Sequence, residues 1–161
     1  MAQKENNEPV TVSYVNLEKY IGLWYEIAKI PNSFQKKCTK NTTAIYSFNE
    51  DSTIKVVNSC ATQDGEISSS EGLARTVDKK TNSKLEVSFV SIFGIHLFWG
   101  DYWIIGLDED YNYAVIGTPD RKYGWIIARS KFLDEGTIKE TYEILKKNGY
   151  NPKDFVMTLQ E

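Results

Sequence analysis

The sequence predicts an all-β fold, an eight-stranded antiparallel up-and-down β-barrel with one C-terminal α-helix packed outside and a short final strand. The first observation behind this prediction is a series of short runs between Trp24 and Arg129, in which polar residues alternate with aromatic and β-branched ones. The second is that turn residues interrupt these runs at fairly regular intervals. The third is that a helical pattern follows the last run. Strands that follow one another so closely pair most simply with their neighbours in sequence.

The connections between the expected strands alternate in length. The strands are predicted at 22–30, 41–48, 53–60, 70–77, 84–90, 101–107, 112–117 and 123–130. Short polar turns are predicted at 49–52, 78–83 and 108–111, and longer links at 31–40, 61–69, 91–100 and 118–122. Successive connections of an up-and-down barrel lie at opposite ends. The pattern therefore predicts one tight end and one open end with elaborate loops.

The helix is expected over residues 134–147. Asp134 is a suitable N-cap, and Gly149 is a suitable stop. An apolar stripe with helical spacing is formed by Ile138, Tyr142 and Leu145. The apolar run 155–159 is expected to return to the sheet as the last short strand.

Length and charge limit the class of protein. The 161 residues suffice for one domain with its own core, expected over 16–161 and preceded by a flexible arm over 1–15. The formal net charge is -3 and the Lys and Arg residues are scattered, which argues against nucleic acid as a partner. The chain lacks the run of about 18 to 20 apolar residues that a membrane-spanning helix needs, and its start lacks the apolar core of a signal peptide. We therefore expect a cytosolic protein, or one whose leader has been removed.

The two cysteines, Cys38 and Cys60, lie 22 positions apart. An even count predicts one disulfide if the compartment is oxidising, and two free thiols if it is not.

Three segments resemble the lipocalin family, most closely its bacterial outer-membrane and apolipoprotein D-like members. These segments are GLWYEIAKIP from Gly22, GDYW from Gly100, and YAVIGTPDRKYGWIIAR ending at Arg129. The resemblance covers residues 16–160. It implies a cup-shaped barrel, or calyx, in which Trp24 plugs the closed end and Arg129 stacks across it. Gly22, Trp24 and Arg129 are then markers of the fold and not catalytic residues, and the stack is a favourable cation–π contact.

Alternation along the strands, together with the family pattern for the strand at 101–107, assigns the side chains that face a ligand cavity. The small residues of the fourth strand, Ser70 among them, leave room for a ligand, although the alternative of a barrel filled by its own side chains stays open. The predicted cavity residues are Phe34, Ala44, Tyr46, Val56, Asn58, Gly72, Ala74, Leu85, Val87, Phe89, Tyr102, Ile104, Tyr123, Trp125 and Ile127. Such a mixture suits an amphiphile with its chain low in the cavity and its head near the rim.

The most apolar stretch of the chain, SIFGIHLFWGDYW from Ser91, is expected at the open end. Gly94 and Gly100 argue against one uninterrupted strand. We expect a hydrophobic lip that covers the entrance and docks on a membrane or a partner, with plain packing of the rim as the alternative. The residues assigned to this lip are Ile92, Phe93, Leu97, Phe98 and Trp99.

The polar residues offer little for catalysis. His96 is the one histidine of the sequence and has no second histidine, carboxylate or thiol near it in sequence, so neither a metal site nor a general base is expected. Glu26 follows Trp24 in the alternation, and we expect it to be a salt-bridged structural residue near the base. No cofactor and no metal are predicted.

The function expected is non-enzymatic binding and transport or storage of small hydrophobic ligands, most simply fatty acids or lysophospholipids. A lipid-modifying enzyme and a protein-interaction module, including a homodimer, are the alternatives on the same fold. The resemblance implies a place in the cell envelope, at the outer membrane or in the periplasm, with a secreted or cytosolic protein still open.

Overall fold

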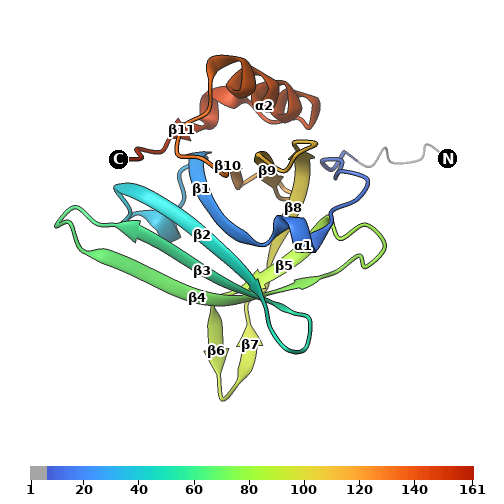
Figure 1. Cartoon of the computed structure of the whole chain (residues 1–161), viewed down its shortest axis with the longest axis vertical. Coiled ribbons are helices and arrows are strands. Elements are labelled where there is room, and N and C mark those ends of the chain that lie inside the picture. The colour runs from blue at the N-terminus through green and yellow to red at the C-terminus, as the bar shows by residue number, and fades with distance from the viewer. Residues whose placement is uncertain (1–6) are drawn as a thin grey trace.

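The chain folds into a closed barrel. The computed structural model describes residues 7–161, so the first six residues of the predicted arm lie outside the described residues. Antiparallel pairing joins eight strands into a wall, and pairing of the last strand with the first closes it (Figure 1). The strands are β1 (Gly22–Lys29), β2 (Lys40–Phe48), β3 (Ile54–Ala61), β4 (Ile67–Thr76), β5 (Lys84–Ser88), β8 (Gly100–Leu107), β9 (Tyr113–Gly117) and β10 (Gly124–Ala128). The predicted eight-stranded barrel is confirmed.

The two ends of the barrel differ, as predicted. The turns between β2 and β3 and between β4 and β5 lie at the same end as the short helix α1 (Leu17–Tyr20) in Figure 1. The connection between β1 and β2, which contains the 3-10 turn η1 (Ser33–Gln35), and the β3–β4 turn lie at the opposite end. Strand β4 starts earlier than predicted, because β3 and β4 stay paired as far as Ala61 and Ile67.

The link between β5 and β8 is a hairpin and not the loop that was predicted. It consists of β6 (Val90–Ile92) and β7 (Ile95–Leu97), which pair with each other and project from the barrel wall (Figure 1). The turn residues Phe93 and Gly94 have φ angles of 51° and 78°. Two consecutive positive φ angles are typical of the tight hairpin turns whose twist matches that of the strands, and the glycine makes this turn accessible.

Two apolar cores lie on opposite sides of the wall. One fills the closed end of the barrel around Trp24. The other lies between the wall and the helix α2 (Glu135–Lys147), whose Leu145 is fully buried. Asp134 caps this helix by accepting a hydrogen bond from the Thr137 amide at 2.7 Å, and Gly149 follows it with a φ of 79°. The predicted helix and its cap are confirmed.

The described part of the N-terminal segment lies against the closed end. The amide of Val15, which is fully buried, donates to the Thr81 carbonyl at 2.8 Å, and the Val12 amide donates to the Ile104 carbonyl at 3.0 Å. These contacts attach residues 9–15 to the barrel. Flexibility of the arm, and the limits of the domain at 16–161, stay predictions.

The C-terminal segment fills a gap in the wall. It follows the 3-10 turn η2 (Pro152–Asp154) and contains the short strand β11 (Val156–Met157), which pairs with β1. Pairing between β1 and β2 ends at Tyr25 and Thr43. Beyond that point the Gln160 side-chain amide donates to the backbone carbonyls of both Glu26 and Thr42, at 2.8 and 2.9 Å. The predicted last strand therefore returns to the sheet, and the residues after it hold β1 and β2 together.

Candidate ligand-binding cavity

The open end of the barrel leads into a cavity of about 610 Å³. Most of the residues predicted to face a ligand line it. These are Phe34, Ala44, Tyr46, Val56, Asn58, Val87, Phe89, Tyr102, Tyr123, Trp125 and Ile127, and Ser70 also lines it. A cavity of this volume, mostly apolar with a few polar groups, is typical of small-molecule sites.

Four predicted cavity residues do not line the cavity. Ala74, Leu85 and Ile104 are buried in the core around Trp24. Gly72 is covered by Phe89, because a Cβ atom at this position would lie 2.7 Å from the Phe89 ring. Alternation places these residues on the inner face, but the barrel is filled by side chains toward its closed end. Depth along the barrel therefore decides which inward residues can reach a ligand.

Several lining residues were not among the predicted cavity residues, although one of them, Phe98, was assigned to the lip over the entrance. They are Glu26, Gln35, Lys37, Cys38, Thr42, Thr43, Ser59, Cys60, Ser68, Val90, Phe98, Gly100, Asp101, Ile116, Thr118 and Asp120. Ile116 follows from the alternation of β9. The connection residues Gln35, Lys37 and Asp120 carry no periodic signal, so their approach to the cavity depends on the course of the loops.

Three hydrogen-bonded tyrosines form the polar floor of the cavity: Tyr46 and Tyr102 line it, and Tyr20 lies behind them in the core. The Tyr102 hydroxyl is hydrogen-bonded to those of Tyr20 and Tyr46, at 2.7 and 2.9 Å. Burial raises the pKa of Tyr46 to about 12 and raises the pKa values of Tyr20 and Tyr102 well above their ordinary value. All three therefore stay neutral phenols at physiological pH.

Trp24 and Arg129 close the barrel below this floor. The Arg129 guanidinium carbon lies 3.8 Å from the centre of the Trp24 ring system, and Trp24 is fully buried. The Arg129 side chain donates to four backbone carbonyls, those of Lys19, Tyr20, Ile21 and Leu23. Burial lowers the pKa of Arg129 from its ordinary value. Gly22 has a φ of 110°, and a Cβ there would lie 3.2 Å from the guanidinium.

Glu26 is buried without an ion pair, so the predicted salt bridge is wrong. Its carboxylate accepts hydrogen bonds from the Gln35 amide at 3.0 Å and from the Thr158 hydroxyl at 2.6 Å. The Gln35 carbonyl oxygen in turn accepts from the Trp125 indole at 3.1 Å. The β1–β2 connection and the C-terminal segment thus satisfy the carboxylate with neutral donors. The side chain lies on the cavity side of Trp24 and not at the base.

Cys38 and Cys60 form a disulfide with their Cα atoms 5.5 Å apart. The bond ties the β1–β2 connection to the end of β3 at the cavity mouth, and both cysteines line the cavity. Of the two alternatives left open by the sequence, the structure has the disulfide.

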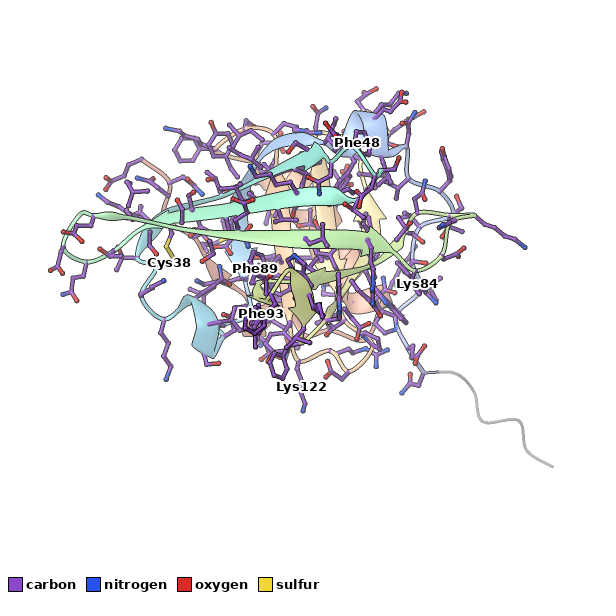
Figure 2. The ribbon with its side chains drawn as sticks, turned by 90° about the horizontal axis from the view of Figure 1, so that it is seen from below. Cys38, Phe48, Lys84, Phe89, Phe93 and Lys122 are labelled. Atoms are coloured by element: carbon purple, nitrogen blue, oxygen red, sulfur yellow. A yellow bond between two sulfur atoms is a disulfide. The ribbon has the colours of Figure 1, made fainter. Side chains whose placement is uncertain are left out.

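The β6–β7 hairpin borders the cavity mouth with its base and exposes its tip. Val90 and Phe98 line the cavity, whereas the Phe93 side chain is fully exposed and Ile95 is 65% exposed. Figure 2 views the molecule from the side to which the hairpin projects, with Phe93 in the hairpin and Phe89 near its base.

Two residues assigned to the lip lie differently from the prediction. Leu97 and Trp99 are half-buried. Trp99 stacks on the guanidinium of Arg75, whose carbon lies 3.7 Å from the ring centre, and Arg75 pairs with Glu86. Trp99 therefore fastens the hairpin to the outer wall instead of covering the entrance.

His96 lies beside Trp99 on the outer side of the wall. Its ring centre lies 6.0 Å from that of Trp99, and its buried Nδ1 atom has no hydrogen-bond partner among the described residues. Across residues 7–161, no three His, Cys, Asp or Glu side chains gather as a metal site would require.

A barrel that is sealed at one end by a Trp–Arg stack and hollow at the other defines a small-ligand-binding protein of the lipocalin type. A family model described as a lipocalin-like domain matches residues 15–160, and the chain belongs to the lipocalin family. Members of this family bind small hydrophobic ligands.

Relatives of known name match most of the chain. Temperature-induced lipocalin-1 of Arabidopsis thaliana is 39% identical over 91% of this chain and 80% of its own length. The outer membrane lipoprotein Blc of Escherichia coli K12 is 33% identical over 92% and 81%, and apolipoprotein D of Macaca fascicularis is 36% identical over 89% and 76%. Among solved structures, insecticyanin from the tobacco hornworm Manduca sexta superposes with a TM-score of 0.73 at 26% identity, covering 94% of this chain and 82% of its own.

The helices of residues 7–161 are too short or too polar to traverse a bilayer.

Proposed function

We propose that this chain is a non-enzymatic carrier or store of single-chain amphiphiles, either fatty acids or lysophospholipids. The observation that carries the proposal is the cavity, whose walls combine a mostly apolar surface with hydroxyl, amide and charged side chains. An acyl chain transferred from water into such a cavity gains about 0.8 kcal/mol for each buried methylene. The polar groups near the mouth suit a head group that stays close to solvent.

The placement of the reactive residues favours a carrier over a lipid-modifying enzyme. An enzyme on this fold needs a reactive thiol or an acid–base pair in the cavity. Cys38 and Cys60 are the cysteines that line the cavity, and they are joined in a disulfide. His96 lies on the outer side of the wall, beside Trp99.

Ligand binding is tested by displacing a fluorescent fatty acid from the cavity with hexadecanoic acid or palmitoyl lysophosphatidylcholine. We expect displacement, together with a change in Trp125 fluorescence. Ala44→Phe should weaken binding at least tenfold, because its ring takes the place of about two methylenes beside Trp24, which pairs with Ala44 across the strands. Ile45→Phe, at the outward-facing neighbour, is the matched control and should bind normally. If neither lipid displaces the probe from the unmodified protein, the proposal is wrong.

We further propose that the hairpin docks on a membrane surface and that the protein works in the cell envelope. The relative named as an outer membrane lipoprotein supports this placement. The exposed tip supports it as well, because Phe93 and Ile95 present large apolar side chains to water, as surfaces that bind a membrane or a partner do. Docking through the tip would bring the cavity mouth, which the hairpin base borders, close to the lipid.

Replacing both Phe93 and Ile95 with Ser is expected to weaken association with vesicles of phosphatidylethanolamine and phosphatidylglycerol at least tenfold, since two apolar side chains no longer enter the interface. Cosedimentation measures the bound fraction. The control is Phe132→Ser, which changes an equally apolar residue that is 72% exposed and precedes α2. Unchanged vesicle binding together with a changed elution volume in gel filtration would instead assign the hairpin to a protein partner or a homodimer.

A further inference from the structure

One side of the cavity mouth is an aromatic face. The ring centres of Tyr123 and Trp125 lie 6.2 Å apart with planes only 7° from parallel, and Phe34 lies 5.4 Å from Tyr123 and 6.5 Å from Trp125. All three residues line the cavity, and Phe34 is 59% exposed. The faces of aromatic rings attract cations, and most strongly those that water solvates weakly, such as quaternary ammonium groups.

A carboxylate lies beside this face. Glu26 is 4% exposed and lines the cavity, and Gln35 links it to Trp125 through one hydrogen bond to each. Among the residues described, Glu26 takes part in none of the ion pairs. Each of its oxygens accepts one bond from a neutral donor, and a carboxylate can accept more. Because Glu26 is buried, its charge is screened less than that of a carboxylate on the surface.

The cations near the cavity are poorly placed to hold an anionic head. Arg129 lies behind Trp24 and bonds to backbone carbonyls, outside the cavity lining. Lys37 lines the mouth but is exposed to solvent, and the carboxylate of Asp120 also lines the mouth. A ligand carboxylate beside the aromatic face would therefore be repelled by the Glu26 carboxylate, and no buried cation among the described residues that line the cavity would offset this repulsion.

We propose that the mouth of this cavity selects amphiphiles whose head carries an ammonium group, and disfavours those that end in a carboxylate. The ammonium lies against Phe34, Tyr123 and Trp125, with Glu26 as the buried counter-charge and the alkyl chain toward the tyrosine floor. This inference rests on the proposed function and separates its two ligand classes, because choline- and ethanolamine-headed lipids carry the cation and fatty acids do not.

The test compares three ligands with the same chain: hexadecyltrimethylammonium, hexadecanol and hexadecanoate. Their dissociation constants are measured by displacement of a neutral fluorescent probe, below micelle formation and at constant salt. We expect the ammonium ligand to bind about tenfold more tightly than the alcohol, and the carboxylate to bind more weakly than the alcohol. Hexadecanoate binding as tightly as hexadecyltrimethylammonium would overturn the inference.

Two sets of variants locate the preference. Glu26→Gln should reduce about tenfold the ratio of hexadecyltrimethylammonium affinity to hexadecanol affinity, whereas Glu50→Gln makes the same change of charge at an exposed turn of the closed end and should leave this ratio unchanged. Tyr123→Leu should lower the preference, and Tyr123→Phe, which keeps the ring, should retain it. If Glu26→Gln does not fold, the pair at Tyr123 decides the question.

The ligands also distinguish failure of this inference from failure of the proposed function. Binding of hexadecanol depends on the cavity and not on head-group charge. Normal hexadecanol binding without any preference for the ammonium overturns the head-group inference alone. If none of the three ligands binds, both the head-group inference and the proposed carrier function are wrong.

Discussion

Trp24→Ala is expected to lower the free energy of unfolding by about 3–5 kcal/mol. The indole is fully buried, donates a 2.7 Å hydrogen bond to the Tyr20 carbonyl and supports the guanidinium of Arg129. Its removal leaves a cavity in the core at the closed end and takes the stacking partner from a partly buried cation. Urea unfolding followed by circular dichroism measures the change.

Trp99→Ala is the matched control for this experiment. Trp99 also stacks on an arginine, Arg75, but it does so outside the barrel and is half-buried. We expect a loss of about 1 kcal/mol or less, because an exposed cation–π contact contributes little. Equal losses for the two variants would contradict the role of Trp24 as the plug of the closed end.

The free energy of unfolding is expected to fall between pH 10 and pH 12. The fall should be larger in the unmodified protein than in the Tyr46→Phe variant. The pKa of Tyr46 rises from 10.0 to about 12 on folding, so the folded state holds this proton more tightly than the unfolded state. Its contribution is complete below pH 10 and is lost as the pH rises toward 12. One pKa unit corresponds to about 1.4 kcal/mol, and each state is only half ionised at its own pKa, so Tyr46 alone contributes about 2 kcal/mol to the fall between pH 10 and pH 12.

The measurement is urea unfolding at a series of pH values from 9 to 12. The Tyr46→Phe variant should lose less stability across this interval than the unmodified protein, although Tyr20 and Tyr102, whose pKa values are also raised by burial, still contribute to the loss. Tyr14→Phe removes an exposed phenol outside the barrel interior and is expected to follow the unmodified protein, which controls for the loss of a tyrosine as such. A Tyr46→Phe curve parallel to that of the unmodified protein would show that Tyr46 does not titrate as argued.

Local periodicity predicted the barrel well. The alternation in segments such as KLEVS and GWIIA predicted strands whose inward side chains could be identified, and those side chains do face inward. Asp134, Gly149 and the stripe through Leu145 predicted the helix in the same way. These signals are local, because each depends on residues within one element and on the period of that element.

The candidate site could be predicted only in part. Leu85 and Val87 lie two positions apart on β5, so both side chains point into the barrel. Leu85 is nevertheless buried in the core, whereas Val87 lines the cavity. Alternation distinguishes inside from outside but contains no measure of depth. The hairpin was missed for a different reason: its turn at Phe93 requires positive φ in a phenylalanine, which residue preferences disfavour.

The sequence by itself determined the eight strands, the helix, the resemblance through Trp24 and Arg129, and a single pair of cysteines available for a bond. Only the tertiary structure decided what surrounds Glu26, because its partners Gln35 and Thr158 come from a loop and from a segment 132 positions away. It also decided that Trp99 lies outside the wall on Arg75. Secondary structure follows from short-range periodicity, whereas the polarity of a cavity depends on contacts between distant segments that no local pattern records.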